Sequence, residues 1–185
     1  MAEYYLISQL PSLDGISSNT PLPISEERFT ELCNRFLGKK AQSAIRNLTL
    51  LPSKEFADSG SAFIDLWNEN ERNLRFALAK VRAEKMKKNF DTENRAFSAE
   101  CVKAASAAIE IENPMEAETY LNQYRLKILE TLRPMDSFSE DYIFYYGLKL
   151  KLLLRVRQFD TQAGKEAYKN IYNSILNGDR LEEIQ

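Results

Sequence analysis

The chain has 185 residues, 44% of them hydrophobic, and its 25 basic and 27 acidic residues give a formal net charge of −2. A chain of this length can bury about 70% of the surface that it exposes when unfolded, so a core can form without disulfides or metals. The balanced charge argues against a protein that binds nucleic acid by neutralising phosphates, because such proteins carry a basic excess.

Residues 1–24 are expected to form an irregular segment. The apolar run from Tyr4 to Leu10 is too short to be assigned by periodicity, and Pro11 ends it. Residues 13–23 combine Gly, Asn, Ser and Pro, which is typical of a turn-rich loop. We expect at most one short strand in the chain, near residues 4–9.

Residues 25–185 are expected to form a single helical domain, an all-α bundle of amphipathic helices. Ser25 is expected to cap the first helix, and a second short helix is expected over residues 39–50. A third helix is expected over residues 59–88. Its apolar residues fall on one stripe at helical spacing: Phe63, Trp67, Leu74, Leu78 and Val81.

Four further helices are expected in the second half of the chain. Residues 92–111 are rich in Ala, which suits a helix packed closely against its neighbours. Asn113 is expected to cap the next helix, with Pro114 at its first position. The last two helices are expected over residues 139–159 and 161–176. The helix after Asn113 carries an apolar stripe formed by Ala117, Leu121, Tyr124, Ile128 and Leu132.

The helix predicted over residues 139–159 is apolar on most of its circumference, which is typical of a helix buried between several others. Lys149 and Arg157 project from its apolar side, where a cation must snorkel, pair with a carboxylate or contact a partner. We expect pairing within the fold, and a partner site is the alternative. We name Glu116, Glu118 and Asp141 as the candidate carboxylates.

Basic residues of the 59–88 helix are the other candidates for contact with a partner. The end of this helix is basic, which we interpret as complementarity to the helix dipole; a phosphate-binding or lipid-binding patch is the alternative. The candidate partner-binding residues of the whole chain are therefore Arg72, Arg75, Lys85, Lys87, Lys88, Lys149 and Arg157.

The sequence lacks the residue that enzymes use most often as a general acid or base at neutral pH. It contains no His, which excludes Ser-His-Asp and Cys-His mechanisms within the chain. Carboxylate or lysine chemistry is not excluded, but no motif points to it. The sequence also lacks the phosphate-binding, zinc-binding and calcium-binding motifs that combine Gly, His or acidic residues at fixed spacing. Cys33 and Cys101 each stand alone and are expected to be buried free thiols. We therefore predict no catalytic residue, no metal site and no cofactor.

Three stretches resemble the C subunit of V/A-type ATPases, whose eukaryotic counterpart is the d subunit. They are residues 67–78 (WNENERNLRFAL), 113–118 (NPMEAE) and 141–155 (DYIFYYGLKLKLLLR). The opening YYLISQLP of residues 4–11 and the overall length resemble more closely a small family of uncharacterised bacterial proteins that accompany V-type ATPase subunits.

The resemblance implies a helical part that joins the membrane rotor ring to the central stalk and has no active site. It implies central-stalk and rotor-ring subunits as partners, in contacts made through shape and charge, and no nucleic acid. The function expected is thus that of a non-enzymatic accessory or central-stalk component. A free-standing helical adaptor that binds a peptide or a partner helix in a groove is the alternative.

The expected location is cytoplasmic. Residues 1–5 have neither the basic nor the apolar region of a signal peptide. The longest apolar run, residues 143–156, is interrupted by charges and is too short to cross a bilayer. We expect no membrane span, and attachment at the inner membrane only peripherally, through an ATPase complex.

Overall fold

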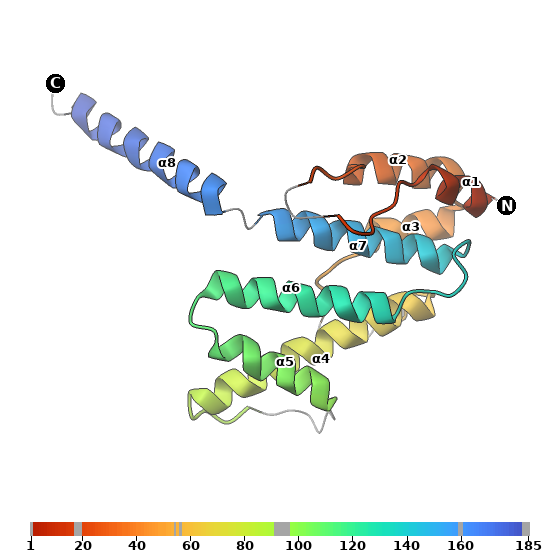
Figure 1. Cartoon of the computed structure of the whole chain (residues 1–185), viewed down its shortest axis with the longest axis horizontal. Helices are drawn as coiled ribbons and strands as arrows, with labels where there is room; N and C mark the ends of the chain where they lie inside the picture. The colour runs from red at the N-terminus through yellow and green to blue at the C-terminus, as the bar shows by residue number, and fades with distance from the viewer. Residues whose placement is uncertain are drawn as a thin grey trace.

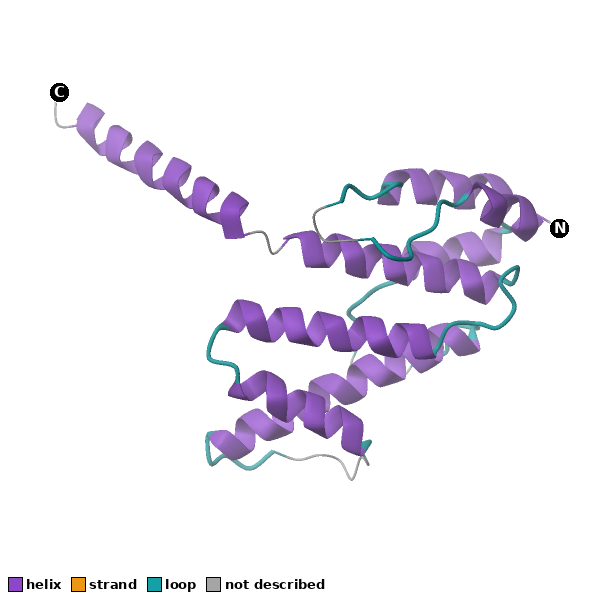
Figure 2. Ribbon diagram, viewed as in Figure 1, coloured by secondary structure: helices purple, strands orange, loops and turns teal. Residues whose placement is uncertain are grey.

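The structure is a computed structural model that describes residues 2–16, 20–53, 55, 57–90, 97–158 and 161–182; for residues 2, 161–163 and 176–182 it describes the backbone alone. Every regular element in these ranges is an α-helix, as Figure 2 shows, so the predicted all-α class is confirmed. The helices are α1 (Ala2–Gln9), α2 (Glu26–Phe36), α3 (Lys39–Asn47), α4 (Ala62–Lys85), α5 (Ala99–Glu110), α6 (Pro114–Thr131), α7 (Glu140–Gln158) and α8 (Thr161–Glu182).

Helix α7 lies at the centre of the body. It contacts α2 and α3 on one side and α4 and α6 on the other, while α5 packs against α4 and α6. Figure 1 shows α6 and α7 side by side, with α4 and α5 beyond α6 and with α1, α2 and α3 beyond α7. Helix α8 extends away from this body (Figure 1).

Two hydrophobic clusters form the core, and α4 contributes to both. The larger cluster surrounds α7 and includes Phe63 and Trp67 from the first half of α4. The smaller cluster joins the second half of α4, through Leu74 and Leu78, to α5 and α6. Four of the five residues of the stripe predicted for this helix are buried, and Val81 packs partly buried against the smaller cluster.

Local sequence signals explain several helix starts. The Ser25 side chain accepts a hydrogen bond from the Arg28 backbone N–H, and Asn113 accepts one from that of Met115, with Pro114 at the first helical position. Both predicted caps are confirmed. The prediction that α7 is buried between several helices is also confirmed, because residues 143–150 and Leu152 are all buried.

The prediction of an irregular segment over residues 1–24 was wrong for its first part. Residues 2–9 form α1 rather than a loop or a strand. Leu6 is fully buried in the larger cluster, and Ile7 packs against that cluster. Burial of one apolar face therefore stabilises a helix that is too short to be recognised from its sequence alone.

Some helix boundaries also differ from those predicted. Helix α4 begins at Ala62 because the Ser61 side chain caps it. Helix α5 begins after the Ser98 cap, while residues 91–96 and Phe159 lie outside the described residues. Helix α8 does not stop near Asn177-Gly178 but continues to Glu182. A Gly inside a helix costs only about 1 kcal/mol, so it need not end one.

The predicted apolar stripe of α6 is only partly buried. Leu121 of that stripe lies in the smaller cluster, whereas the fully buried Leu129, which is not on it, belongs to the larger one. This helix thus packs on two sides. The polar side chains of Asn122 and Arg125, which lie between Leu121 and Leu129 along the helix, are also buried.

Candidate functional site

A buried ion pair joins α4 to α6 where the two hydrophobic clusters meet. Glu71 on α4 is 3% exposed and Arg125 on α6 is 8% exposed. The guanidinium binds both carboxylate oxygens, with Nε 3.0 Å from Oε2 and Nη2 3.1 Å from Oε1. Such a two-point contact fixes the relative orientation of the two side chains as well as their distance.

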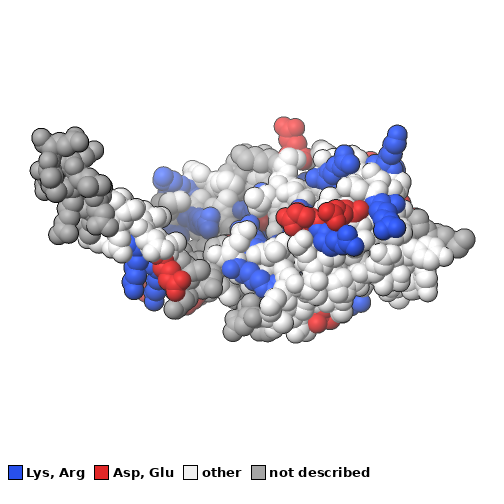
Figure 3. Space-filling view, turned by 90° about the horizontal axis from the view of Figure 1, so that it is seen from above, with Lys and Arg blue, Asp and Glu red and all other residues white. Residues whose placement is uncertain are grey.

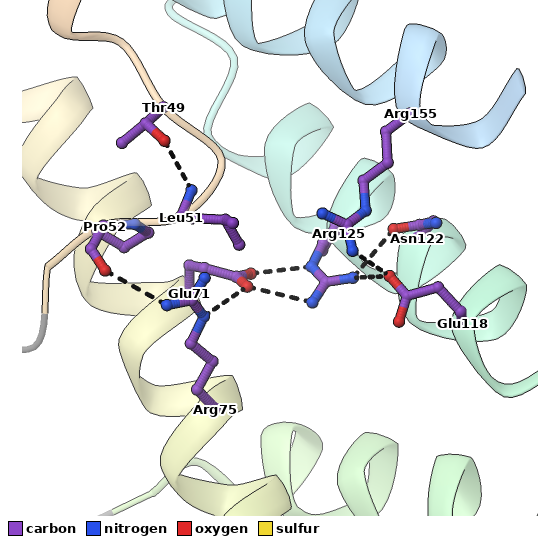
Figure 4. Close-up of polar contacts among 9 residues, drawn as sticks. All are labelled: Thr49, Leu51, Pro52, Glu71, Arg75, Glu118, Asn122, Arg125 and Arg155. Atoms are coloured by element: carbon purple, nitrogen blue, oxygen red, sulfur yellow. Dashed lines mark hydrogen bonds and ion pairs between the residues drawn. The ribbon is translucent and has the colours of Figure 1, made fainter. Parts of the chain in front are cut away.

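Further charges of alternating sign extend this pair in both directions (Figure 4). Nη1 of Arg125 lies 3.2 Å from Glu118 Oε1, and the same oxygen accepts a hydrogen bond from Arg155 Nη2 of α7 at 2.7 Å. On the other side, Arg75 Nε lies 3.3 Å from Glu71 Oε1, and its Nη1 donates to the Pro52 carbonyl oxygen at 3.3 Å. Arg75, Glu71, Arg125, Glu118 and Arg155, which we call the ion chain, thereby connect α4, α6 and α7.

The ion chain keeps its central guanidinium charged. Burial alone would lower the pKa of Arg125, but its hydrogen bonds and ion pairs with Glu71 and Glu118 outweigh burial and leave that pKa above its ordinary value. The Asn122 carbonyl oxygen accepts a further hydrogen bond from Arg125 Nη1, at 3.0 Å. Removal of one partner would leave a buried charge uncompensated.

Sequence reasoning missed the ion chain. Glu71 and Arg75 stand four residues apart, which is a visible helical pair, but Arg125 lies 54 residues from Glu71. The available signal was the interruption of the apolar stripe of α4 between Trp67 and Leu74, where Glu71 lies.

A second ion cluster surrounds Lys149 on α7. Its Nζ lies 2.5 Å from Asp14 Oδ1, 2.6 Å from Glu130 Oε1 and 3.2 Å from the Tyr145 hydroxyl. Burial would lower the pKa of Lys149, but these contacts raise it above its ordinary value. The hydrogen bond from Lys149 lowers the pKa of Asp14, while burial, with the hydrogen bond to Glu130, raises the pKa of Tyr145 to about 12.

The prediction that Lys149 pairs with carboxylates inside the fold is confirmed, but its partners are not those expected. Glu118 instead binds Arg125 and Arg155, as part of the ion chain. Asp141 accepts a hydrogen bond from the Ser61 hydroxyl, and Glu116 accepts one from the Asn113 side chain. Asp14 was missed because it belongs to the segment predicted to be irregular.

Arg157, which was predicted to pair with a carboxylate, donates a hydrogen bond to the Thr20 carbonyl oxygen. The two cysteines are buried free thiols, as predicted. Burial raises the pKa of Cys33 to about 12 and raises that of Cys101 as well, so both remain protonated at neutral pH.

The seven candidate partner-binding residues do not form one surface. Arg72 is buried, Arg75 belongs to the ion chain, and Lys149 lies in its own ion cluster. The basic end of α4 is exposed, and there Lys85 donates a hydrogen bond to the Ile109 carbonyl oxygen. Arg72 and Lys85 are thirteen positions apart along the helix, or about 20 Å. A role in partner binding stays a prediction for these residues.

Helix α8 carries an apolar face that the described part of the protein leaves uncovered. Tyr168, Ile171, Tyr172 and Ile175 recur at i, i+3, i+4 and i+7, and are each between 52% and 68% exposed. None of the four belongs to either hydrophobic cluster. We call these four residues the α8 stripe. The sequence predicted a helix here but gave no sign that this face would lie in solvent.

The face of the body seen in Figure 3 shows Lys and Arg side chains interspersed with Asp and Glu. Among the described residues, none of the helices is long and apolar enough to cross a membrane. The same residues contain no group of three or more Cys, Asp or Glu side chains placed to hold a metal ion.

Comparison with known proteins finds a family model that matches part of the chain. Residues 98–179 match the model of a family described as "Protein of unknown function (DUF2764)". The match runs from the cap of α5 through α6 and α7 and includes the whole α8 stripe. No curated protein and no solved structure matches the chain.

Proposed function

We propose that the protein is a non-enzymatic docking component of a V/A-type rotary ATPase that joins or assembles rotor parts, in the manner of the C subunit of these ATPases. The resemblance of residues 67–78, 113–118 and 141–155 to that protein suggests the partner. The single structural observation that carries a docking role is the α8 stripe.

The α8 stripe suits the binding mode in which an amphipathic helix lays its apolar face into a groove of a partner. Burial of one large apolar side chain contributes roughly 1.5–3 kcal/mol, so four such side chains can offset a substantial part of the cost of association. The Tyr168 and Tyr172 rings are already stacked, with centroids 6.2 Å apart, and this preorganises half of the stripe.

The ion chain supports the same proposal from inside the body. A part that passes force between a rotor ring and a stalk must keep its helices in a fixed arrangement. The ion chain ties α4, α6 and α7 together through two-point and shared contacts. On this proposal α7 connects a stiff body to the docking helix that follows it.

The test is a pull-down of the full chain against rotor-ring and central-stalk subunits from the same organism. We expect association that weakens at high salt if the basic residues at Lys85–Lys88 also contribute. The double variant Ile171→Gln with Ile175→Gln should lose most of the binding. Its matched control, Asn170→Gln with Asn173→Gln, changes the other side of the same helix and should bind as the wild type does.

A free-standing helical adaptor is the second candidate, and the α8 stripe also favours it, because a helix can dock onto any partner with a suitable groove. The same pull-down separates the two. Absence of the ATPase subunits at both low and high ionic strength would remove the rotary assignment and leave the adaptor.

A further inference from the structure

A pocket of about 410 Å³ lies between α3, residues 49–53 and 57–59, and α4. Its volume falls within the range of roughly 300–1,000 Å³ that is typical of sites for small molecules. No residue of the ion chain or of the α8 stripe lines it. The pocket is therefore a feature separate from the proposed docking function.

Five polar residues of α3 and α4 line this pocket, together with Ala44 and Ile64 of the same helices. Lys40, Ser43 and Asn47 recur at i, i+3 and i+7 along α3, so they share one face of that helix. Asn68 and Arg72 stand four residues apart on α4 and line the opposite wall. Helices α3 and α4 do not pack closely against each other, and Lys40, Ser43 and Asn47 are exposed, so these polar residues are accessible to a ligand from solvent.

Most of these side chains keep their hydrogen-bonding capacity. Lys40, Ser43, Asn47 and Asn68 make no side-chain hydrogen bond or ion pair with any residue in the described ranges. Arg72 is only 6% exposed and has a contact of its own within the protein, but a guanidinium has five N–H donors and can bind a ligand as well.

The charge in the pocket favours an anion. Lys40 and Arg72 are its two cations, and Asp58 is its single carboxylate. Oδ1 of Asp58 already accepts a hydrogen bond from the Gly60 backbone N–H at 2.8 Å. Gly60 has a φ of +78°, and a Cβ there would lie 3.6 Å from Lys40 Cε, so this turn of the loop runs beside the lysine.

We propose that this pocket binds a small phosphorylated molecule through its phosphate group. A planar guanidinium and a compact ammonium group together suit phosphate oxygens, and hydroxyl and amide groups add neutral donors. A single phosphate ion would occupy only part of the volume. Asn47 and Asn68 therefore remain to bind the polar body of the ligand.

Isothermal titration calorimetry of the full chain tests the proposal with three probes: ribose 5-phosphate, inorganic phosphate and ribose. We expect saturable binding of ribose 5-phosphate and none of ribose. The variant Lys40→Ala should bind about tenfold more weakly, because it loses one charge-assisted contact. Lys40 is exposed, so this variant should fold normally, which far-UV circular dichroism will check.

Lys39→Ala is the matched control, since Lys39 is the exposed neighbour on the same helix and does not line the pocket. It should bind ribose 5-phosphate within about twofold of the wild type, since its ammonium lies outside the site and long-range charge effects are screened by salt. Inorganic phosphate that binds as tightly as ribose 5-phosphate would identify free phosphate as the ligand. Three results would each overturn the proposal: no saturable binding of either phosphate probe, equal affinity for ribose, or equal losses in the two lysine variants.

Discussion

Helices α7 and α8 follow one another in the chain and have similar lengths of 19 and 22 residues, yet their surroundings are opposite. Helix α7 is buried over residues 143–150 and at Leu152 and contacts four other helices. Helix α8 extends into solvent with its apolar stripe exposed (Figure 1). Both sequences are rich in apolar residues at helical spacing.

The two helices differ in how much of their surface the pattern of apolar residues requires to be covered. Helix α7 is apolar on most of its circumference, and such a helix is stable only when several neighbours cover it. Helix α8 has one apolar stripe and a polar remainder, so a single partner can cover it, and that partner need not belong to the same fold. A pattern therefore indicates how much of a helix must be covered, but not which surface covers it.

The largest effect should come from the charges inside the body. Arg125→Met leaves Glu71 buried beside Arg75 alone, and removal of one partner of a buried pair costs about 3–5 kcal/mol. Urea unfolding monitored by circular dichroism measures this loss. The matched control is Arg28→Ala, which breaks the exposed pair with Glu31 and should cost less than about 1 kcal/mol. Equal losses would contradict the structural role of the ion chain.

Truncation of an apolar side chain should cost much more stability in α7 than in α8, and this difference should be nearly as large as that between the two arginine variants. Leu150 on α7 is fully buried, so Leu150→Ala should lower the free energy of unfolding by about 2–5 kcal/mol. Ile171→Ala in the α8 stripe should change it by less than about 0.5 kcal/mol, because an exposed position makes few contacts to lose. The same denaturation experiment measures both. A large loss from Ile171→Ala would mean that α8 is covered within the protein.

A glycine in each helix gives a sharper comparison. A Cβ at Gly147 of α7 would lie 2.9 Å from Leu48 Cδ2 and 3.1 Å from the Phe29 ring. Gly147→Ala should thus destabilise the protein by about 1 kcal/mol net, since overpacking outweighs the better helix propensity. Gly164→Ala in α8 meets no atom within 4 Å and should stabilise that helix by up to about 1 kcal/mol. Thermal melts that rank the two variants in the opposite order would refute this reasoning.

The smallest predicted effect is a pH dependence of the cluster around Lys149. The pKa of Asp14 is lowered in the folded state, so its contribution to stability is present above its ordinary pKa of 3.8 and is lost as pH falls through the lower folded value. At pH 7 the free energy of unfolding of the wild type should be higher than that of Asp14→Asn. The difference should be less than about 1 kcal/mol, because the Asp14 side chain is largely exposed. The free energy of unfolding of the two proteins, measured between pH 7 and pH 3, should become more similar as pH falls. A difference that grows toward pH 3 would contradict the lowered pKa of Asp14 in the folded state.

Much of the fold could be predicted because its signals are local. The caps at Ser25 and Asn113 need only the residues beside them, and the burial of α7 follows from its own composition. Helix α1 was missed because eight residues show little periodicity, and its formation depends on burial of Leu6. The pairing of Lys149 was predicted because an apolar helix cannot leave a cation unsatisfied.

The partners in these clusters could not be predicted, since they depend on contacts between distant parts of the chain. Asp14 and Lys149 lie 135 residues apart, and Glu71 and Arg125 lie 54 apart. The sequence indicates that each charge needs a partner. Only the packing of α4 against α6, and of the N-terminal segment against α7, determines which carboxylate lies within reach.

The ion chain also bears on how the protein unfolds. It crosses the boundary between the two hydrophobic clusters, because Glu71 and Arg125 lie between them and Arg155 reaches in from α7. Separation of the clusters would expose the apolar surface between them and also leave charges in a partly dry environment without partners. Neither cluster can therefore open alone at low cost. The body of the protein should lose its structure in one cooperative transition, although its core has two parts.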